Sequence, residues 1–350
     1  MIGSPEIDGF VFKQQLMCSA RCTLWRAEQT VLERDVLIAV FGEEVLQNAG
    51  IGDALFGVVR TLAQHRSCLI PDIIDVIRSE HQAYVVLEDC HAQNILHLLN
   101  GHRLRVEPML QIATALATGF AELQSAHLVY GGLRPKSLYI SEDSEPVLPD
   151  LSVVTFEPGV GINPPVETLV GSAPYVAPEQ YQAPGTVDTR ADMFALGMTL
   201  YALVTGQVPF GALSPDEILQ QKLKASIPSP CDMAPHFPDT VAAVLAKLAH
   251  RDAAKRYADW DEVLFDLHQA SHGIMPNGEI YPGSVIAPPN PEAYPKPGRT
   301  IRLSVEDLRL YRQRHQKQNR AWVGSLLFWL GITLLLLFGI LAVLAKEVLS

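Results

Sequence analysis

The stretch YGGLRPKS, residues 130–137, has the residue types and spacing of an active-site loop. It joins a predicted apolar helix to a predicted apolar strand, and it holds two glycines, an arginine, a proline and a serine. General acid–base chemistry needs a group that accepts a proton near neutral pH, most often a histidine or a carboxylate. The stretch contains neither. The sequence therefore predicts a loop shaped for catalysis that has no proton acceptor of its own.

The elements expected to position this loop change from strands to helices along the chain. Four short runs predict strands, three of them in an antiparallel meander within residues 7–45: FVFKQQL, CTLWRAE, DVLIAVF and YVVLE. Apolar residues at helical spacing, or apolar runs too long for a strand, predict helices at 52–65, 107–126, 191–206, 241–252 and 260–271. Strands followed by helices predict an α+β fold with a small sheet-rich lobe and a larger helical lobe.

Composition limits the class of protein. The chain has 350 residues, of which 48% are hydrophobic, and this is enough for a sizeable core. Its formal net charge of −11 argues against nucleic acid as a partner, because nucleic-acid binding needs a dense basic face. The five cysteines are an odd number without a CxxC pair, so they predict reduced thiols in a cytosolic compartment.

The C-terminal part predicts a membrane anchor. Residues 321–345 form an uncharged apolar run of 25 residues, long enough as a helix to cross a bilayer core of about 30 Å. A basic juxtamembrane segment, 301–320, precedes it, and a short tail, 346–350, follows it. Because positive charge stays on the cytoplasmic side, we expect a single-pass, tail-anchored membrane protein with its N-terminal domain in the cytoplasm and an extracytoplasmic tail. Closely spaced prolines predict an extended linker over 273–300.

Residues 171–210, GSAPYVAPEQYQAPGTVDTRADMFALGMTLYALVTGQVPF, resemble the second half of a bacterial Hanks-type Ser/Thr protein kinase domain. The Ala-Pro-Glu ending at Glu179 matches the motif that closes the family's activation segment. Asp192 and Gly197 match its D-x-x-x-x-G helix. Arg256, in RDAAKRYADWDE, stands where the family places the partner of the Ala-Pro-Glu glutamate.

The resemblance covers residues 8–272 and implies the bilobal protein kinase fold, with a small antiparallel-sheet N-lobe and a larger helical C-lobe. It also implies structural roles for the matched residues. Glu179 and Arg256 would form a buried ion pair, and Asp192 would hold the backbone of the loop at 130–137 by hydrogen bonds. All of these residues are expected to maintain the larger lobe.

Most catalytic positions of the family carry other residues here. The Gly-rich loop over the ATP phosphates, L-G-x-G-x-x-G-x-V-Y-x-A, aligns with LMCSARCTLWRA at 16–27, which has no glycine. The lysine of V-A-I-K becomes Ala39, and the helix that should pair with it offers no glutamate. In H-R-D-L-K-P-x-N, the catalytic aspartate becomes Gly132 and the metal-binding asparagine becomes Ser137.

One catalytic position survives. In PDLSV, residues 149–153, Asp150 matches the metal-binding aspartate of D-F-G. Two interpretations stay open: Asp150 binds a cation beside a nucleotide, or its carboxylate caps local backbone amides in a turn. Three cations in or beside the first two predicted strands, Lys13, Arg21 and Arg26, could reach a phosphate, although solvated charge on strand edges explains them as well.

These observations predict a membrane-anchored cytosolic pseudokinase that acts as a protein-interaction or regulatory scaffold. We expect it to bind a cytosolic or membrane-associated protein partner, to use no cofactor and to transfer no phosphate, because general-base assistance alone contributes about 10²–10⁴ in rate. Two alternatives stay open, both with ATP and magnesium at Asp150: a weak or atypical Ser/Thr protein kinase, and a nucleotide-binding sensor.

Overall fold

The computed structural model describes residues 5–19, 21–79, 82–157, 172–182, 187–209, 213–224, 227–234 and 236–276. The chain divides into two units, Met1–Arg302 and Leu303–Ser350, and every described residue belongs to the first. From residue 277 onward, the predicted linker, basic segment, transmembrane helix and tail lie outside the described residues. Within the part that is described, no helix is long and apolar enough to cross a membrane.

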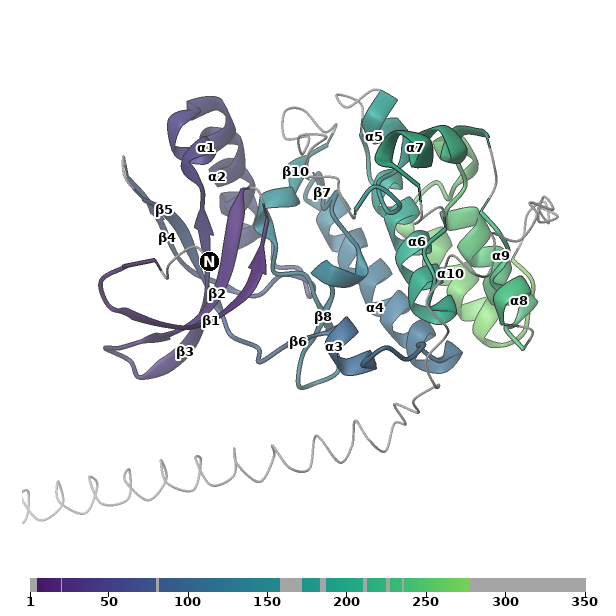
Figure 1. Ribbon diagram of the computed structural model, residues 1–350, viewed down its shortest axis with the longest axis horizontal. Helices are drawn as coiled ribbons and strands as arrows, with labels where there is room; N and C mark the ends of the chain where they lie inside the picture. Colours follow the sequence, from purple (N-terminus) through teal and green to yellow (C-terminus); the bar gives the residue numbers. More distant parts are fainter. Residues whose placement is uncertain are drawn as a thin grey trace, which may run out of the picture. The chain divides into compact units, whose positions relative to one another are not determined.

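The N-terminal lobe is a five-stranded antiparallel sheet in the order β1-β2-β3-β5-β4 (Figure 1). Its strands are β1 (Phe10–Cys18), β2 (Cys22–Gln29), β3 (Arg34–Phe41), β4 (Ile73–Arg78) and β5 (Ala83–Glu88). The predicted meander and the predicted strand at 84–88 are confirmed. The sequence did not predict β4, an edge strand with no fully buried residue and therefore no clear apolar alternation.

Two helices follow β3, α1 (Glu43–Gln47) and α2 (Ala49–Gln64). One side of α2 is buried and apolar, with Leu55, Val58 and Leu62 among its residues. Its one acidic residue, Asp53, bonds Arg78 of β4, with 2.6 Å between Oδ1 and Nη1. Apolar packing therefore holds this helix against the sheet without a carboxylate on its inner face.

The C-terminal lobe is helical. It contains α3 (Ile95–Leu99), α4 (Val106–Ser125), α5 (Pro178–Gln182), α6 (Arg190–Thr205), α7 (Pro215–Lys224), α8 (Pro230–Met233), α9 (Asp239–Leu248) and α10 (Trp260–Ser271). The five helices predicted from the sequence are all present, with ends displaced by at most four residues. The fold is thus bilobal, with an antiparallel-sheet N-lobe and a helical C-lobe (Figure 1). For the described residues, this confirms the fold predicted from the sequence.

Several short strands and single helical turns lie in the connecting loops. β6 (Gln93–Asn94), β8 (Tyr139–Ile140) and β9 (Pro146–Val147) form a small sheet, and β7 (Leu128–Val129) pairs with β10 (Thr155–Phe156). Among the described residues, these loops also contain two single-turn 3₁₀ helices, η1 (Pro135–Ser137) and η2 (Leu151–Val153), and a third, η5 (Ala253–Lys255), joins α9 to α10. The loop at 130–137 lies between β7 and β8, as the predicted helix–loop–strand order requires.

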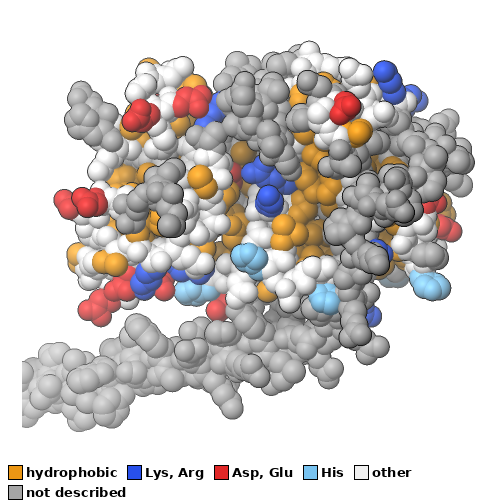
Figure 2. Space-filling view, in the orientation of Figure 1, with side chains coloured by type: hydrophobic (Ala, Val, Ile, Leu, Met, Phe, Trp, Pro, Cys, Tyr) orange, Lys and Arg blue, Asp and Glu red, His pale blue; other side chains and the backbone are white. Residues whose placement is uncertain are grey.

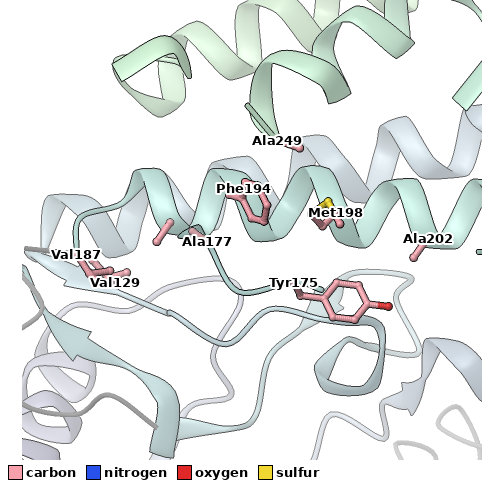
Figure 3. Packing of buried hydrophobic residues seen from close by; sticks show 9 residues of the cluster. Val129, Tyr175, Ala177, Val187, Phe194, Met198, Ala202 and Ala249 are labelled. Atoms are coloured by element: carbon pink, nitrogen blue, oxygen red, sulfur yellow. The ribbon is translucent and has the colours of Figure 1, made fainter. Parts of the chain in front are cut away.

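Helix α6 is the centre of the helical lobe. Every residue from Ala191 to Thr205 is buried, because the helix is apolar on all faces. It ends at Gly206, whose φ of 69° is the left-handed conformation that glycine adopts without strain. Figure 3 shows Phe194, Met198 and Ala202 along this helix, with Ala249 on one side and Tyr175 on the other.

Candidate functional site

The loop at 130–137 is fixed by two residues that bond its backbone. The Asp192 carboxylate of α6 accepts hydrogen bonds from the backbone N–H groups of Tyr130 (2.8 Å) and Gly131 (2.7 Å). At the other end, the Ser137 hydroxyl accepts from the Arg134 N–H at 3.0 Å and lies 3.1 Å from the carbonyl oxygen of Gly132, to which it can donate. Ser137 is buried, and its hydroxyl closes the loop onto itself.

Gly132, at the position of the family's catalytic aspartate, has no room for a side chain. A Cβ atom on this residue would lie 2.7 Å from Cγ2 and 2.8 Å from Cβ of Val153. Carbon atoms in contact prefer separations of about 3.5–4.0 Å. Its neighbour Gly131 has a φ of +72°, which most side chains resist. Both glycines are therefore required by the backbone and packing of this loop.

The Asp150 carboxylate is bonded to Ser152, two residues further along the chain. Oδ1 accepts hydrogen bonds from the backbone N–H (3.1 Å) and the hydroxyl (2.6 Å) of Ser152, at the start of η2. The side chain is 1% exposed. Burial raises the pKa of Asp150, and the bonds from Ser152 and the charge of Arg134 oppose that rise. Of the two interpretations drawn from the sequence, this geometry is the one in which the carboxylate caps a turn.

The segment aligned with the Gly-rich loop forms a tight turn between β1 and β2. The Ser19 N–H donates to the Cys22 carbonyl at 2.8 Å, and the Cys22 N–H donates to the Ser19 hydroxyl at 3.1 Å. Cys22, at the third glycine position, is 2% exposed. Burial raises the pKa of its thiol well above the ordinary value, and the nearby charge of Asp150 raises it further. A buried thiol thus stands at the third glycine position, where this turn enters β2.

Ala39, at the position of the ATP-binding lysine, is completely buried in β3. Its neighbours across the sheet are Leu24 of β2 and Val85 of β5, so its surroundings are apolar. The three cations considered as substitutes face carboxylates instead: Lys13 lies 2.7 Å from Asp35, Arg26 bonds Asp89 at 3.2 Å and at a second, shorter contact, and Arg21 lies 3.6 Å from Glu44.

Tyr139 joins the two lobes, and sequence reasoning missed it. Its hydroxyl, on β8, donates to the backbone carbonyl of Leu16 on β1 at 3.0 Å. The ring is 5% exposed and packs with Ala92 and Val147. Burial raises the pKa of Tyr139, and the charge of Asp150 contributes to that rise. The only signal in the sequence is a hydroxyl-bearing residue inside the otherwise apolar run LYI.

Two of the predicted structural residues, Glu179 and Arg256, form the expected buried ion pair. Arg256 donates to both carboxylate oxygens of Glu179, with 2.9 Å for the Nη2–Oε2 bond. It also donates to the carbonyl oxygens of His250 and Arg190, each at 2.7 Å. Its side chain is fully buried. Every nitrogen of the guanidinium therefore has an acceptor, which offsets the cost of burying the charge.

Gly197 and Lys222 complete this region. A Cβ on Gly197 would lie 2.9 Å from the Cβ of Ala249, so glycine lets α6 and α9 approach closely. Lys222, which the sequence analysis did not single out, is 2% exposed and donates to the carbonyl oxygens of Ala173 and Val176. Burial lowers the pKa of its ammonium group well below the ordinary value. Its position four residues after the buried Ile218 on α7 was the available signal.

The comparison with known proteins decides the family. Residues 53–266, more than half of the chain, match the protein kinase domain. The chain belongs to the protein kinase domain family. By the motif resemblance drawn from the sequence, the loop at 130–137 is matched to the family's catalytic loop and 149–153 to its metal-binding segment.

Curated relatives are named as bacterial serine/threonine-protein kinases. A probable kinase PknB of Lactococcus lactis is 26% identical over 199 residues, which is 57% of this chain and 31% of that protein. PknL of Mycobacterium tuberculosis is 23% identical over 71% of this chain and 62% of that protein. The chain thus spans less than two thirds of the length of these relatives. Among solved structures, the kinase domain of M. tuberculosis PknI (C20A mutant) has a TM-score of 0.58 at 17% identity, covering 75% of this chain and 96% of that one. This likeness concerns the fold.

The residues present do not fit the ATP and magnesium that the family binds. The lysine position is a buried alanine, Ala39, and the Ser137 hydroxyl is bonded within its own loop. Tyr139 and Leu16 are bonded across the lobes.

Proposed function

We propose that this chain is a pseudokinase, a protein with the kinase fold that transfers no phosphate and acts as a protein-interaction or regulatory scaffold. The packing of Val153 against Gly132 is the observation that carries the proposal. In the family, an aspartate at this position accepts the proton of the substrate hydroxyl. Here the carboxylate is absent and its space is filled, so no small side-chain movement supplies the missing base.

Three further features support the absence of phosphate transfer. Ala39 provides no charge for the α and β phosphates, and the one acidic residue of α2, Asp53, pairs with Arg78. Asp150 is engaged by Ser152. Kinases turn over at about 1–100 per second, and losing a general base costs about 10²–10⁴ of that rate. Loss of the base alone would leave about 10⁻⁴ to 1 per second, and the missing phosphate-positioning lysine lowers this rate further.

Three buried polar side chains of the helical lobe have hydrogen-bond partners, and this supports a scaffold role. Arg256, Asp192 and Lys222 are buried polar groups, each with several hydrogen bonds. All the hydrogen bonds described for these three side chains join them either to backbone groups or to the Glu179 carboxylate. Such networks preserve one defined surface, which is what a binding partner requires.

The names of the relatives favour a second candidate, a weak or atypical Ser/Thr protein kinase. It would use Asp150 and a cation held outside the usual ligand set. A nucleotide-binding sensor is the intermediate case, with ATP bound at Asp150 and no transfer. Both would use the second oxygen of the Asp150 carboxylate, since the bonds from Ser152 end on Oδ1.

A phosphate-transfer assay tests the proposal. The full-length protein, purified in mild detergent, is incubated with radiolabelled ATP, magnesium or manganese, and casein as a generic acceptor. We expect no incorporation above that of the Asp150→Asn variant, into either protein. Incorporation that Asp150→Asn abolishes would establish the kinase candidate instead.

We also propose that residues 321–345 anchor the protein in a membrane and that its N-terminal domain faces the cytoplasm. The support is the length and apolarity of this run and the basic segment before it. We expect the full-length chain to stay in membranes after alkaline carbonate extraction, and a chain ending at residue 320 to be released. Release of both chains would contradict the anchor.

A further inference from the structure

We propose that His268 and His272, one turn apart on α10, bind a divalent transition-metal ion through their two imidazoles. The chain reads HQASH at 268–272. Histidines at positions i and i+4 of a helix lie on the same face, and this is the spacing at which the H-E-x-x-H motif holds zinc. Gln269 stands in place of that motif's glutamate, so the pair points to binding of an ion without the hydrolytic chemistry of that motif.

The two rings stand at a distance that suits one shared ion. Their centroids are 4.5 Å apart and their planes are inclined by 42°. An ion bonded at about 2.0–2.1 Å to one nitrogen of each ring would hold the ring centres about 4.5–5.2 Å apart. Both side chains are exposed, so they can rotate toward a common ion, and water can fill its remaining coordination positions. The helix therefore presents both ligands without a movement of its backbone.

The hydrogen bonds of the His272 ring favour metal binding. Its Nδ1 lies 2.8 Å from the backbone carbonyl oxygen of His268. A carbonyl oxygen can only accept, so Nδ1 carries the proton, and in the neutral ring Nε2 keeps its lone pair for a metal. The Ser271 hydroxyl donates to the same carbonyl at 2.7 Å and can accept from Nδ1 at 3.1 Å. Histidines that bind metals commonly make such a bond from the ring nitrogen that does not touch the ion.

The pair lies at the C-terminal end of α10, which is a favourable place for a cation. The carbonyl end of a helix carries partial negative charge, and this stabilises positive charge within the last turn. The backbone there is held in a defined turn. The N–H of Gly273 bonds the Ala270 carbonyl at 3.1 Å, and the N–H of Ile274 bonds the Gln269 carbonyl at 3.0 Å. These bonds keep the last turn of the helix formed, and with it the spacing of the two imidazoles.

Two imidazole ligands select the class of ion. Imidazole nitrogen suits zinc, copper, iron and nickel, whereas magnesium and calcium prefer oxygen ligands. For one set of nitrogen ligands, the affinity of divalent ions rises from manganese to copper and falls again at zinc. We therefore expect Cu²⁺ to bind most tightly, Ni²⁺ and Zn²⁺ to bind more weakly, and Mg²⁺ not to compete.

Titration of the full-length protein with Cu²⁺ tests this inference. The protein carries no histidine tag, is purified in mild detergent and is freed of metal with a chelator beforehand. At a Cu²⁺ concentration that saturates this site, we expect the unaltered protein to bind one ion more per chain than His268→Gln or His272→Gln. Either change removes one ligand and should weaken binding at this site at least about tenfold. Pulsed EPR of the bound Cu²⁺ should show two coordinated imidazoles, and millimolar Mg²⁺ should not displace the ion.

His65→Gln is the matched control. Histidine side chains are exposed at several separate places on one face of the molecule (Figure 2), so binding by a single imidazole must be distinguished from binding by the pair. His65 is exposed, and its Nδ1 lies 3.2 Å from the carbonyl oxygen of Thr61, one turn earlier. It thus has the same contact from ring to backbone, with threonine in place of the second histidine. This variant should leave the affinity and the EPR signal unchanged, and circular dichroism checks that all three variants are folded.

Equal Cu²⁺ binding by His272→Gln and the unaltered protein would overturn the inference, and so would an EPR signal from a single imidazole. One ion for every two chains would overturn a site made by one chain. The inference does not rest on the proposed function, because neither histidine belongs to the loop at 130–137 or to the segment at 149–153. Phosphate transfer in the assay above would end the pseudokinase proposal and leave this metal site standing.

Discussion

Gly132 and Val153 compete for one space: a Cβ atom on Gly132 would lie 2.7 Å from Cγ2 of Val153 and 2.8 Å from its Cβ. Valine is branched at Cβ and has no flexible end that could swing away. The position that carries the catalytic aspartate elsewhere in the family is therefore closed by packing as well as altered in chemistry. Restoring the carboxylate alone would not restore the site.

Gly132→Asp should destabilise the protein by about 1–3 kcal/mol, the usual cost of overpacking, and should give no phosphate transfer. Adding Val153→Gly should recover part of that loss, so the double variant is more stable than the sum of the single changes predicts. Urea unfolding followed by tryptophan fluorescence measures both effects. Gly50→Asp is the control, because Gly50 is exposed and its nearest neighbour is 3.4 Å away. Equal effects at positions 50 and 132 would refute the packing explanation.

Tyr139→Phe should lower the free energy of unfolding by about 0.5–1.5 kcal/mol, because it removes the hydroxyl bond to the Leu16 carbonyl and keeps the ring. Since that bond joins the lobes, amide hydrogen exchange in β1 should become faster while exchange in α6 stays unchanged. Tyr84→Phe, a similar change within the N-lobe sheet, serves as the control. Unchanged exchange in β1 would mean that the bond does not couple the lobes.

Glu179→Gln should destabilise the helical lobe strongly, by about 3–5 kcal/mol, because it leaves the Arg256 charge buried and only partly compensated. Lys13→Gln breaks an exposed ion pair with Asp35 and should produce no measurable change. Thermal unfolding of the two variants against the unaltered protein makes the comparison. Similar small shifts for both would show that the buried pair is not needed for the fold.

Much of this fold could be predicted from the sequence, because its helices have clear apolar patterns and end signals. α6 is apolar on every face and ends at a glycine, so both its burial and its end follow from residue types alone. The edge strand β4 could not be predicted, because four of its six residues are exposed. The strand is held by its pairing with β5 and by the bond from Arg78 to Asp53, and these are long-range contacts that no local pattern reports.

The sequence predicted which residues occupy the candidate site but not how they are packed. The residues that replace the catalytic groups, Ala39 and Gly132, could be located by their place in the family's motifs. What surrounds them could not, because Val153 reaches Gly132 from another loop and Tyr139 reaches Leu16 across 123 residues of chain. Such contacts depend on how loops are packed. They are also the ones that decide whether a lost group could be restored.

Stability should depend on pH through Asp192. Burial, together with the charges of Glu157 and Asp188, raises the pKa of Asp192 from its ordinary value near 3.8 to about 7, despite the bonds from Tyr130 and Gly131. The native state therefore holds this proton over a pH range in which the unfolded chain has lost it. The stability this proton contributes is complete below about pH 4 and is lost as the pH rises through 7.

The Asp192→Asn variant isolates this effect, because asparagine has no carboxyl proton to lose. The free energy of unfolding of the unaltered protein, relative to Asp192→Asn, should be greater at pH 5 than at pH 8. Urea unfolding at the two pH values measures the difference. A constant difference, or one that grows toward pH 8, would show that Asp192 is ionised throughout.

We expect the pseudokinase proposed here to bind no nucleotide. Thermal unfolding of the full-length protein, with and without millimolar ATP and magnesium, tests it most directly. A ligand at 100 times its dissociation constant adds about 2.7 kcal/mol of stability, and this would raise the unfolding midpoint measurably. We predict no shift. A shift that Asp150→Ala abolishes would contradict the claim and would establish a metal-dependent nucleotide site.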